Sequence, residues 1–124
     1  MSATDGPLAA RLFAHLADGR FHSGEELAGR LKVSRSAVWK AAKSLRSLGL
    51  SLQAVRNRGY SLGWPVTPLD AATIRERLAR ELRARVGRLE TVWSIDSTNS
   101  ALLARPGPES GTSEALLAEY QSAG

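Results

Sequence analysis

Hydrophobic residues recur at helical spacing in the first third of the chain and predict two short helices there. Pro7 suits the first position of the first helix, and Asp18-Gly19 ends it; its apolar residues are Leu8, Leu12, Phe13 and Leu16. Ser23-Gly-Glu-Glu26 is typical of a capping box, in which Ser23 caps the Glu26 amide and Glu26 reaches back to the Ser23 amide. Leu27 and Leu31 give the second helix an inward face.

A third helix is predicted after the turn at Lys32-Val33. Ser34 is its expected N-cap, the helix runs from about Arg35 to Leu48, and Gly49 follows as the C′ residue. At about 100° per residue, one side of this helix is apolar: Val38, Ala41, Ala42, Leu45 and Leu48. The other side is polar and basic: Ser36, Lys40, Lys43 and Ser47, flanked by Arg35, Trp39 and Arg46. Two helices joined by a short turn over about residues 24–43 follow the helix-turn-helix plan.

Alternating residues then predict two strands at 50–55 and 60–62, so that a wing spans about residues 50–62. The turn between the strands, Arg56-Asn-Arg-Gly59, carries two cations. The first half of the chain is therefore expected to form a winged helix-turn-helix domain over residues 1–65.

Two prolines in Gly63-Trp-Pro-Val-Thr-Pro68 indicate a linker or domain boundary. Beyond it, the pattern predicts one helix capped by Asp70 and ending at Gly87, with Ile74, Leu78 and Leu82 on its inner face. Strands are expected at 88–95 and 114–120, with a short helix at 99–104 between them. Because these few elements cannot cover both faces of a sheet, residues 66–124 are expected to be a linker and an incomplete second domain. The fold class is α+β: a winged helix followed by the start of an α/β domain.

Charge divides the chain in the same place. Of the 17 basic and 12 acidic residues, ten basic and four acidic ones lie in residues 1–69, and no acid lies between Glu26 and Asp70. Residues 70–124 carry seven basic and eight acidic residues. This asymmetry indicates a segment that faces nucleic acid, joined to a segment with another role.

The basic residues fall where a winged helix contacts duplex DNA. A helix with serines and lysines on its outer face suits the major groove, and a basic wing adds phosphate or minor-groove contacts. The candidate DNA-binding residues are Ser34, Arg35, Ser36, Trp39, Lys40, Lys43, Ser47, Arg56 and Arg58. The alternative interpretation is a winged helix that contacts protein, in which the core pattern persists without a DNA-facing role.

Several classes of protein are excluded by what the sequence lacks. Without cysteine there is no disulfide framework, thiolate zinc site or Cys nucleophile, and two histidines, His15 and His22, cannot make a multi-His metal site. No apolar run reaches the roughly 18 residues of a membrane span. Met1–Pro7 has no feature of a secretion signal, so a cytoplasmic location is expected.

Five segments in order resemble the bifunctional biotin–protein ligases, enzymes that also repress biotin synthesis genes. In the winged helix they are residues 16–27 (Leu-Ala-Asp-Gly-Arg-Phe-His-Ser-Gly-Glu-Glu-Leu), Ser34-Arg-Ser-Ala-Val-Trp-Lys40 and Arg58-Gly-Tyr-Ser-Leu62. Ile95-Asp-Ser-Thr-Asn99 and Ala118-Glu-Tyr-Gln-Ser-Ala-Gly124 resemble the start of the family's catalytic domain.

The resemblance implies a two-step reaction, in which ATP, with Mg²⁺, adenylates biotin and the biotinyl group then passes to a lysine of a carboxyl carrier protein. Ser97, Thr98 and Asn99 match the Ser-Thr-Asn that helps to hold biotin, and Gln121 matches a biotin-contacting glutamine. The chemistry is consistent, since a neutral ureido ring needs short uncharged donors and acceptors. From the residues alone, Ser97 is also the expected N-cap of the short helix after the strand.

In the family, a Gly/Arg-rich loop and a catalytic lysine follow the position of Gly124. The resemblance therefore implies no catalytic residue within this chain, and a chain of this length is expected to bind DNA without ligase turnover. The family also implies a homodimer on a two-half-site operator. The alternative is a stand-alone winged-helix regulator without enzymatic activity.

Overall fold

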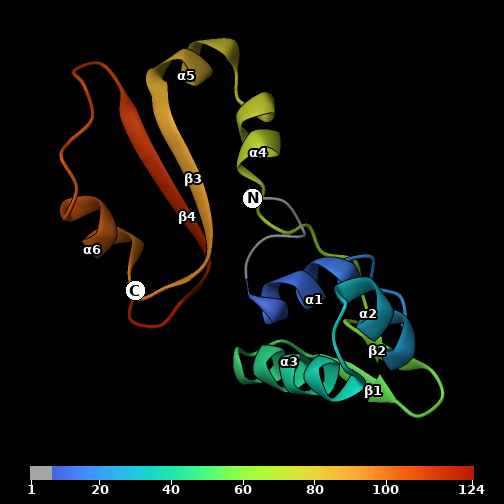
Figure 1. Ribbon diagram of the computed structural model, residues 1–124. Helices are drawn as coiled ribbons and strands as arrows, with labels where there is room; N and C mark the ends of the chain where they lie inside the picture. Colours follow the sequence, from blue (N-terminus) through green and yellow to red (C-terminus); the bar gives the residue numbers. More distant parts are fainter. Residues whose placement is uncertain (1–6) are drawn as a thin grey trace. The chain divides into compact units, whose positions relative to one another are not determined.

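The computed structural model describes residues 7–124, which form two compact units divided between Pro68 and Leu69 (Figure 1). The division falls three residues beyond the boundary expected from the sequence. The segment Met1–Gly6, which shows no secretion signal in the sequence, lies outside the described residues. No helix of the described part is long and apolar enough to cross a membrane.

Three helices form the body of the first unit: α1 (Leu8–Leu16), α2 (Gly24–Leu31) and α3 (Arg35–Ser47). Their inward residues make one core, because the apolar stripes predicted from the spacing face one another: Leu12, Phe13, Leu16, Leu27, Ala28, Leu31, Val38, Ala41, Ala42 and Leu45 are buried. Pro7 is the N-cap of α1 and not its first helical residue, because its ψ of 158° is extended.

Side-chain caps start α2 and α3 where the sequence predicts them. The Ser23 hydroxyl accepts a hydrogen bond from the Glu26 amide at 3.0 Å, and the Ser34 hydroxyl accepts one from the Ala37 amide at 3.1 Å. The second half of the predicted capping box is wrong, because the Glu26 carboxylate pairs with Arg30 at 3.0 Å instead of reaching back to the Ser23 amide. Gly49 follows α3 with a φ of 97°, as a C′ glycine should.

The wing is a two-stranded antiparallel ribbon of β1 (Gln53–Val55) and β2 (Gly59–Ser61), with Ala54 opposite Tyr60. Its first strand is shorter than predicted, because the Leu52 amide bonds to the Leu50 carbonyl and residues 50–52 turn rather than extend. The wing is fixed to the start of α2 by two backbone hydrogen bonds of 2.9 Å between His22 and Tyr60.

The segment after the wing runs along the first unit. The Ser61 hydroxyl donates to the Gly19 carbonyl at 2.9 Å and accepts from the Gly63 amide at 2.9 Å. The Val66 amide then donates to the Ala17 carbonyl at 2.8 Å. Gly19 allows this close approach, since a Cβ there would lie 2.5 Å from the Trp64 carbonyl carbon. The predicted linker is thus ordered against the end of α1.

The second unit opens with two short helices, α4 (Ala71–Arg77) and α5 (Arg80–Arg85), where the sequence predicts one. The helix breaks because Leu78 and Ala79 adopt extended ψ angles of 142° and 145°. The Arg83 guanidinium satisfies carbonyls released at the break, donating to Glu76 at 3.0 Å and to Leu78 at 3.2 Å. Gly87 was expected to end this helix but lies within the following strand.

A β-α-β arrangement completes the second unit (Figure 1). Strand β3 (Val86–Ile95) leads through α6 (Thr98–Leu103) to β4 (Ser113–Gln121), and the two strands pair in parallel. Strand β3 starts two residues earlier than predicted, and β4 starts one residue earlier. Little of this unit is buried: among its described residues, only Leu116 and Thr91 are buried.

Candidate nucleic-acid interface and small-molecule site

Helix α3 presents every predicted DNA-binding residue of the helix-turn-helix on its exposed side. The buried residues of α3 occupy the opposite side, as the helical spacing predicts. The exposed set is Ser34, Arg35, Ser36, Trp39, Lys40, Lys43 and Ser47. None of these side chains packs in the core, although the Ser34 oxygen caps α3 and the Ser47 hydroxyl donates to the Ser44 carbonyl at 2.6 Å.

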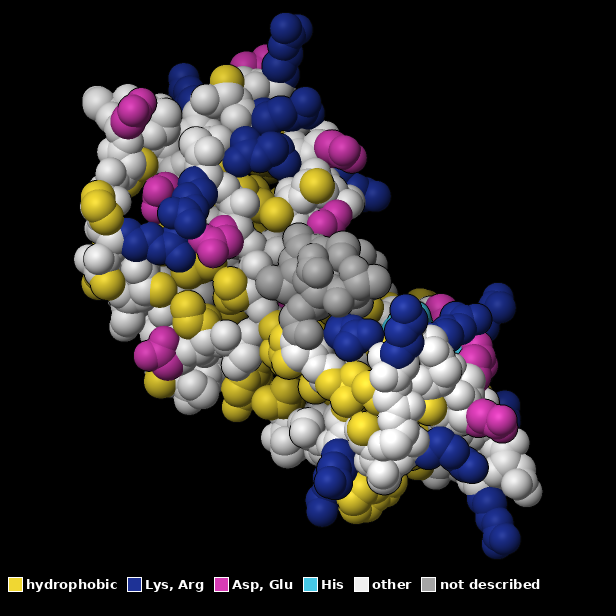
Figure 2. Space-filling model, in the orientation of Figure 1, with side chains coloured by type: hydrophobic (Ala, Val, Ile, Leu, Met, Phe, Trp, Pro, Cys, Tyr) yellow, Lys and Arg dark blue, Asp and Glu magenta, His cyan; other side chains and the backbone are white. Residues whose placement is uncertain are grey.

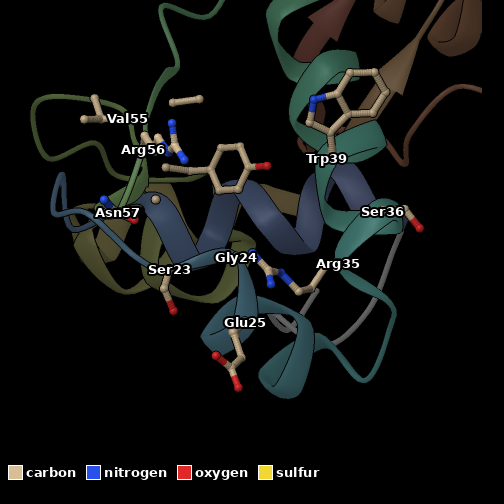
Figure 3. A pocket seen from close by; sticks show the side chains of 12 residues that line it. Ser23, Gly24, Glu25, Arg35, Ser36, Trp39, Val55, Arg56 and Asn57 are labelled. Carbon is tan, nitrogen blue, oxygen red and sulfur yellow. The ribbon is translucent and has the colours of Figure 1, made fainter.

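An open groove of about 700 Å³ lies between α3, the start of α2 and the wing (Figure 3). Arg35, Ser36 and Trp39 line it from α3, and Val55, Arg56 and Asn57 line it from the wing. In Figure 3 Arg35 extends from α3 toward Gly24, whereas Glu25 points away from the centre of the groove. The groove joins the predicted recognition helix to the predicted wing in one concave surface.

The cations of this surface are not equivalent. Lys40 and Arg56 are exposed and have no hydrogen bond or ion pair within residues 7–124. Lys43 lies over the Trp39 ring, with its Nζ 5.2 Å from the ring centroid. Arg58 stacks on Phe21, with its guanidinium carbon 4.1 Å from the ring centroid, and Arg46 donates to the Leu52 carbonyl at 3.1 Å. The sequence predicts the same DNA-binding role for Arg56 and Arg58. In the structure Arg58 is held by Phe21, and only Arg56 keeps its guanidinium free to bind a phosphate at the wing tip.

The acidic residues described in the first unit, Asp18, Glu25 and Glu26, lie toward α2 (Figure 2). Asp18 contacts the His22 ring at 2.9 Å, and the hydrogen bond from the Arg20 amide, followed by the one from His22, lowers the pKa of Asp18. Burial lowers the pKa of His15, so that this ring stays neutral more readily than a free histidine. Among the described residues no group of three or more His, Asp or Glu side chains could hold a metal ion.

The second candidate site lies at the carboxyl ends of β3 and β4. Because the strands are parallel, with Ile95 opposite Gln121, the residues that follow β3 meet the end of β4. The Gln121 side-chain oxygen accepts two hydrogen bonds from Thr98, from its amide at 2.8 Å and from its hydroxyl at 3.0 Å. The structure therefore joins two predicted biotin-contacting residues that lie 23 positions apart in the sequence.

Ser97 and Asn99 flank this pair. The Ser97 hydroxyl caps α6 by accepting from the Ser100 amide at 3.2 Å, as expected from the residues alone. That bond uses a lone pair of the oxygen and leaves its O–H free to donate. Asn99 is exposed in the first turn of α6, and the Gln121 amide nitrogen has no partner among the described residues.

Two residues, Phe21 and His22, make contacts near this surface that the sequence does not predict. His22 pairs with the wing through Tyr60 and, through Asp18, with the end of α1; Phe21 holds Arg58. Residues 21 and 22 lie just before a predicted cap and in no predicted element, so only the wing's position in space reveals their role.

Residues 11–61 match a protein family described as HTH domain. Over all 124 residues the chain is 43% identical to the bifunctional ligase/repressor BirA of Salmonella typhimurium, and it is 40% identical over 120 residues to the protein of that name from Escherichia coli. The Bacillus subtilis protein of that name is 32% identical over 108 residues. These alignments cover 97% or more of this chain for the first two relatives and 87% for the third. The chain spans about a third of each relative, 36%, 35% and 33% respectively.

Proposed function

We infer that this chain, which resembles bifunctional ligase/repressors over its whole length, is the N-terminal portion of a protein of that family. The observation that carries the inference is the agreement between that similarity and the exposed basic surface of α3 and the wing. Residues 1–65 would be the DNA-binding domain, and 66–124 the linker and the first part of the catalytic domain.

The proposed first function is repression through duplex DNA. Lys40, Lys43 and Arg56 supply phosphate contacts, while Ser36 and Ser47 lie on the face of α3 that suits base edges. Ser34 and Arg35 lie at the start of α3, where a recognition helix enters the major groove. Arg58 acts by holding the wing against Phe21 more than by binding a phosphate of its own. A homodimer on two half-sites would follow for the whole protein.

The proposed second function is biotin binding at the ends of β3 and β4. The four residues fit a ureido ring, because they leave uncharged donors on Ser97, Asn99 and Gln121 and acceptors on Thr98 and Asn99. Within the whole protein, ATP with Mg²⁺ would supply the activated phosphate that adenylates biotin before its transfer to a carrier lysine. None of the four side chains is charged or nucleophilic, so we expect them to bind and orient biotin without catalysing its transfer, in a cytoplasmic protein.

Salt-dependent binding of duplex DNA tests the first function. The affinity of the full chain for a 30-base-pair duplex would be measured from 50 to 200 mM salt, where each phosphate contact contributes about 0.9 to the log–log slope. Replacing Lys40 and Lys43 with alanine should lower that slope by about two and leave the melting temperature unchanged. Arg30→Ala is the matched control, since Arg30 is an exposed cation of α2 paired with Glu26 outside the groove. A salt-independent affinity would contradict DNA binding and favour a winged helix that contacts protein.

Biotin titration of the same chain tests the second function. Gln121→Ala should weaken biotin binding at least tenfold, because it removes both the amide donors and the oxygen that positions Thr98. Gln53→Ala in the wing is the matched control and should leave biotin binding unchanged. DNA binding without any biotin binding would favour the stand-alone regulator.

A further inference from the structure

Trp39 is the large aromatic residue on the exposed side of α3. The side chains that α3 buries are Val38, Ala41, Ala42 and Leu45, whereas Trp39 is 52% exposed. A half-exposed indole on a face of serines and lysines costs hydration free energy without contributing to the core. Its position leaves apolar surface on α3 that a ligand can contact.

Cations one helical turn away on either side restrict what that contact can be. Arg35 precedes Trp39 by four residues, and Lys43 follows it by four, so all three share one stripe of α3. The Lys43 ammonium lies over the ring at 5.2 Å from its centroid. This face of the indole is covered, which disfavours base stacking there and leaves the ring edge and the other face free.

The wing adds a second apolar side chain across the groove. Val55 is 42% exposed and lines the groove together with Trp39, next to Arg56. Figure 3 shows Trp39 projecting from α3 and Val55 on the wing. Apolar side chains set among cations fit a ligand in which an apolar group lies close to phosphates.

Thymine presents such a group. Its C5-methyl is the apolar feature that distinguishes base pairs in the major groove, and it lies at the outer edge of the pair near the backbone of its own strand. If Arg35 and Lys43 each contact a phosphate of the strand, the Trp39 indole between them lies at that edge of the base pair. Apolar contact with the thymine methyl is one of the recurrent forms of direct base readout.

We propose that Trp39 is a specificity-determining residue that reads thymine methyl groups in the major groove. This inference rests on the proposed DNA-binding function and adds to it the base that α3 selects. Each half-site then contains at least one thymine whose methyl group faces Trp39, while Lys40 and Lys43 contribute affinity for every sequence.

Uracil substitution tests the proposal, because it removes only the methyl group. Duplexes with a randomised centre would be selected with the full chain, and each thymine of the selected duplex replaced singly by uracil. At one or two positions uracil should lower the affinity of the unaltered chain about fourfold, the effect of one buried methyl group. Trp39→Ala should bind the thymine and uracil duplexes equally at those positions and keep its melting temperature, since the indole is exposed.

Lys40→Ala is the matched control, because Lys40 is an exposed cation beside Trp39, whereas Lys43 is the lysine that lies over the ring. It should weaken binding to all duplexes and lower the salt slope by about one, yet retain the uracil effect. The proposal is overturned if uracil changes the affinity at no position, or if it lowers the affinity of Trp39→Ala as much as that of the unaltered chain. Either result leaves the proposed DNA binding unaffected. A chain that binds no duplex with salt-dependent affinity overturns the proposed DNA binding itself.

Discussion

The two units of this chain differ in how far each completes its own packing. Twelve of the thirteen buried apolar residues of the described part lie in residues 7–68, and Leu116 alone lies in residues 69–124. Helices α1 to α3 each bury at least three residues against one another, whereas α4, α5 and α6 bury none. The first unit is thus a closed domain, and the second is a parallel strand pair of the kind that proteins normally cover on both faces.

This difference changes how each candidate site is built. The candidate DNA-binding side chains lie on the outer surface of a domain that has its own complete core. The packing of that core therefore determines that they are exposed. The candidate biotin residues stand at the carboxyl ends of two strands, and only backbone register and one glutamine side chain bring them together. A surface on a closed core tolerates change in its side chains, while a site at strand ends depends on the pairing of those strands.

Truncating a leucine in each unit should show the largest contrast. Leu45 in α3 is fully buried, so Leu45→Ala should lower the free energy of unfolding by about 2–5 kcal/mol and abolish DNA binding at 37 °C. Leu103 in α6 is 77% exposed, so Leu103→Ala should change that free energy by less than about 0.5 kcal/mol. Denaturant unfolding followed by circular dichroism measures both. An equal loss in Leu103→Ala would show that this side chain is buried in the folded protein.

Alanine at three glycines separates backbone strain from steric contact. Gly59 has a φ of 100°, and a Cβ there would lie 2.0 Å from the His22 carbonyl oxygen that the wing pairs with. Gly59→Ala should therefore cost more than about 2 kcal/mol and release the wing, because the backbone of two segments must move.

Two further glycines are the controls for this prediction. Gly49 has a φ of 97° with nothing within 4 Å, so Gly49→Ala should cost only the strain of about 1–2 kcal/mol. Gly107 in the second unit has neither a positive φ nor a neighbour within 4 Å, and its substitution should be nearly neutral. Thermal unfolding measures all three variants, and an equal cost at Gly59 and Gly49 would contradict the wing contact.

The sequence predicts the elements of the first unit well because its signals are local. Ser23 and Ser34 cap helices within three residues of themselves, and Gly49 stops α3 through its own φ. The break at Leu78 is not predicted, because the helical spacing of apolar residues continues across it and Arg83 satisfies the released carbonyls from five and seven residues away.

The candidate sites also contain some features that local sequence predicts and others that depend on long-range contacts. Exposure of Lys40 and Lys43 follows from helical angle alone, so the sequence suffices to predict it. The stacking of Arg58 on Phe21 requires the wing's position in space, and the bonds from Thr98 to Gln121 require the parallel pairing of strands 18 residues apart. Long-range pairing of this kind leaves no periodic signal in a sequence.

Acid sensitivity should give the smallest contrast between the units. The hydrogen bond from the Arg20 amide, followed by that from His22, lowers the pKa of Asp18, and the hydrogen bonds from the Thr73 hydroxyl and amide lower the pKa of Asp70. A carboxylate with a lowered folded-state pKa stabilises the fold above its unfolded pKa of about 3.9. That stabilisation is lost as the pH falls through the folded-state pKa. Both groups are exposed, so water and salt reduce the effect.

Asparagine at either position keeps the side-chain oxygen as an acceptor and removes the charge. Asp18→Asn should lower the melting temperature of the first unit slightly at pH 7, and the gap to the unaltered chain should close as the pH falls below about 4. Asp70→Asn should show the same closing gap in the second unit alone, because Asp70 caps α4. Molar salt should shrink both gaps at pH 7, since it screens exposed charges. A gap that widens toward acid would mean that these carboxylates destabilise the folded chain.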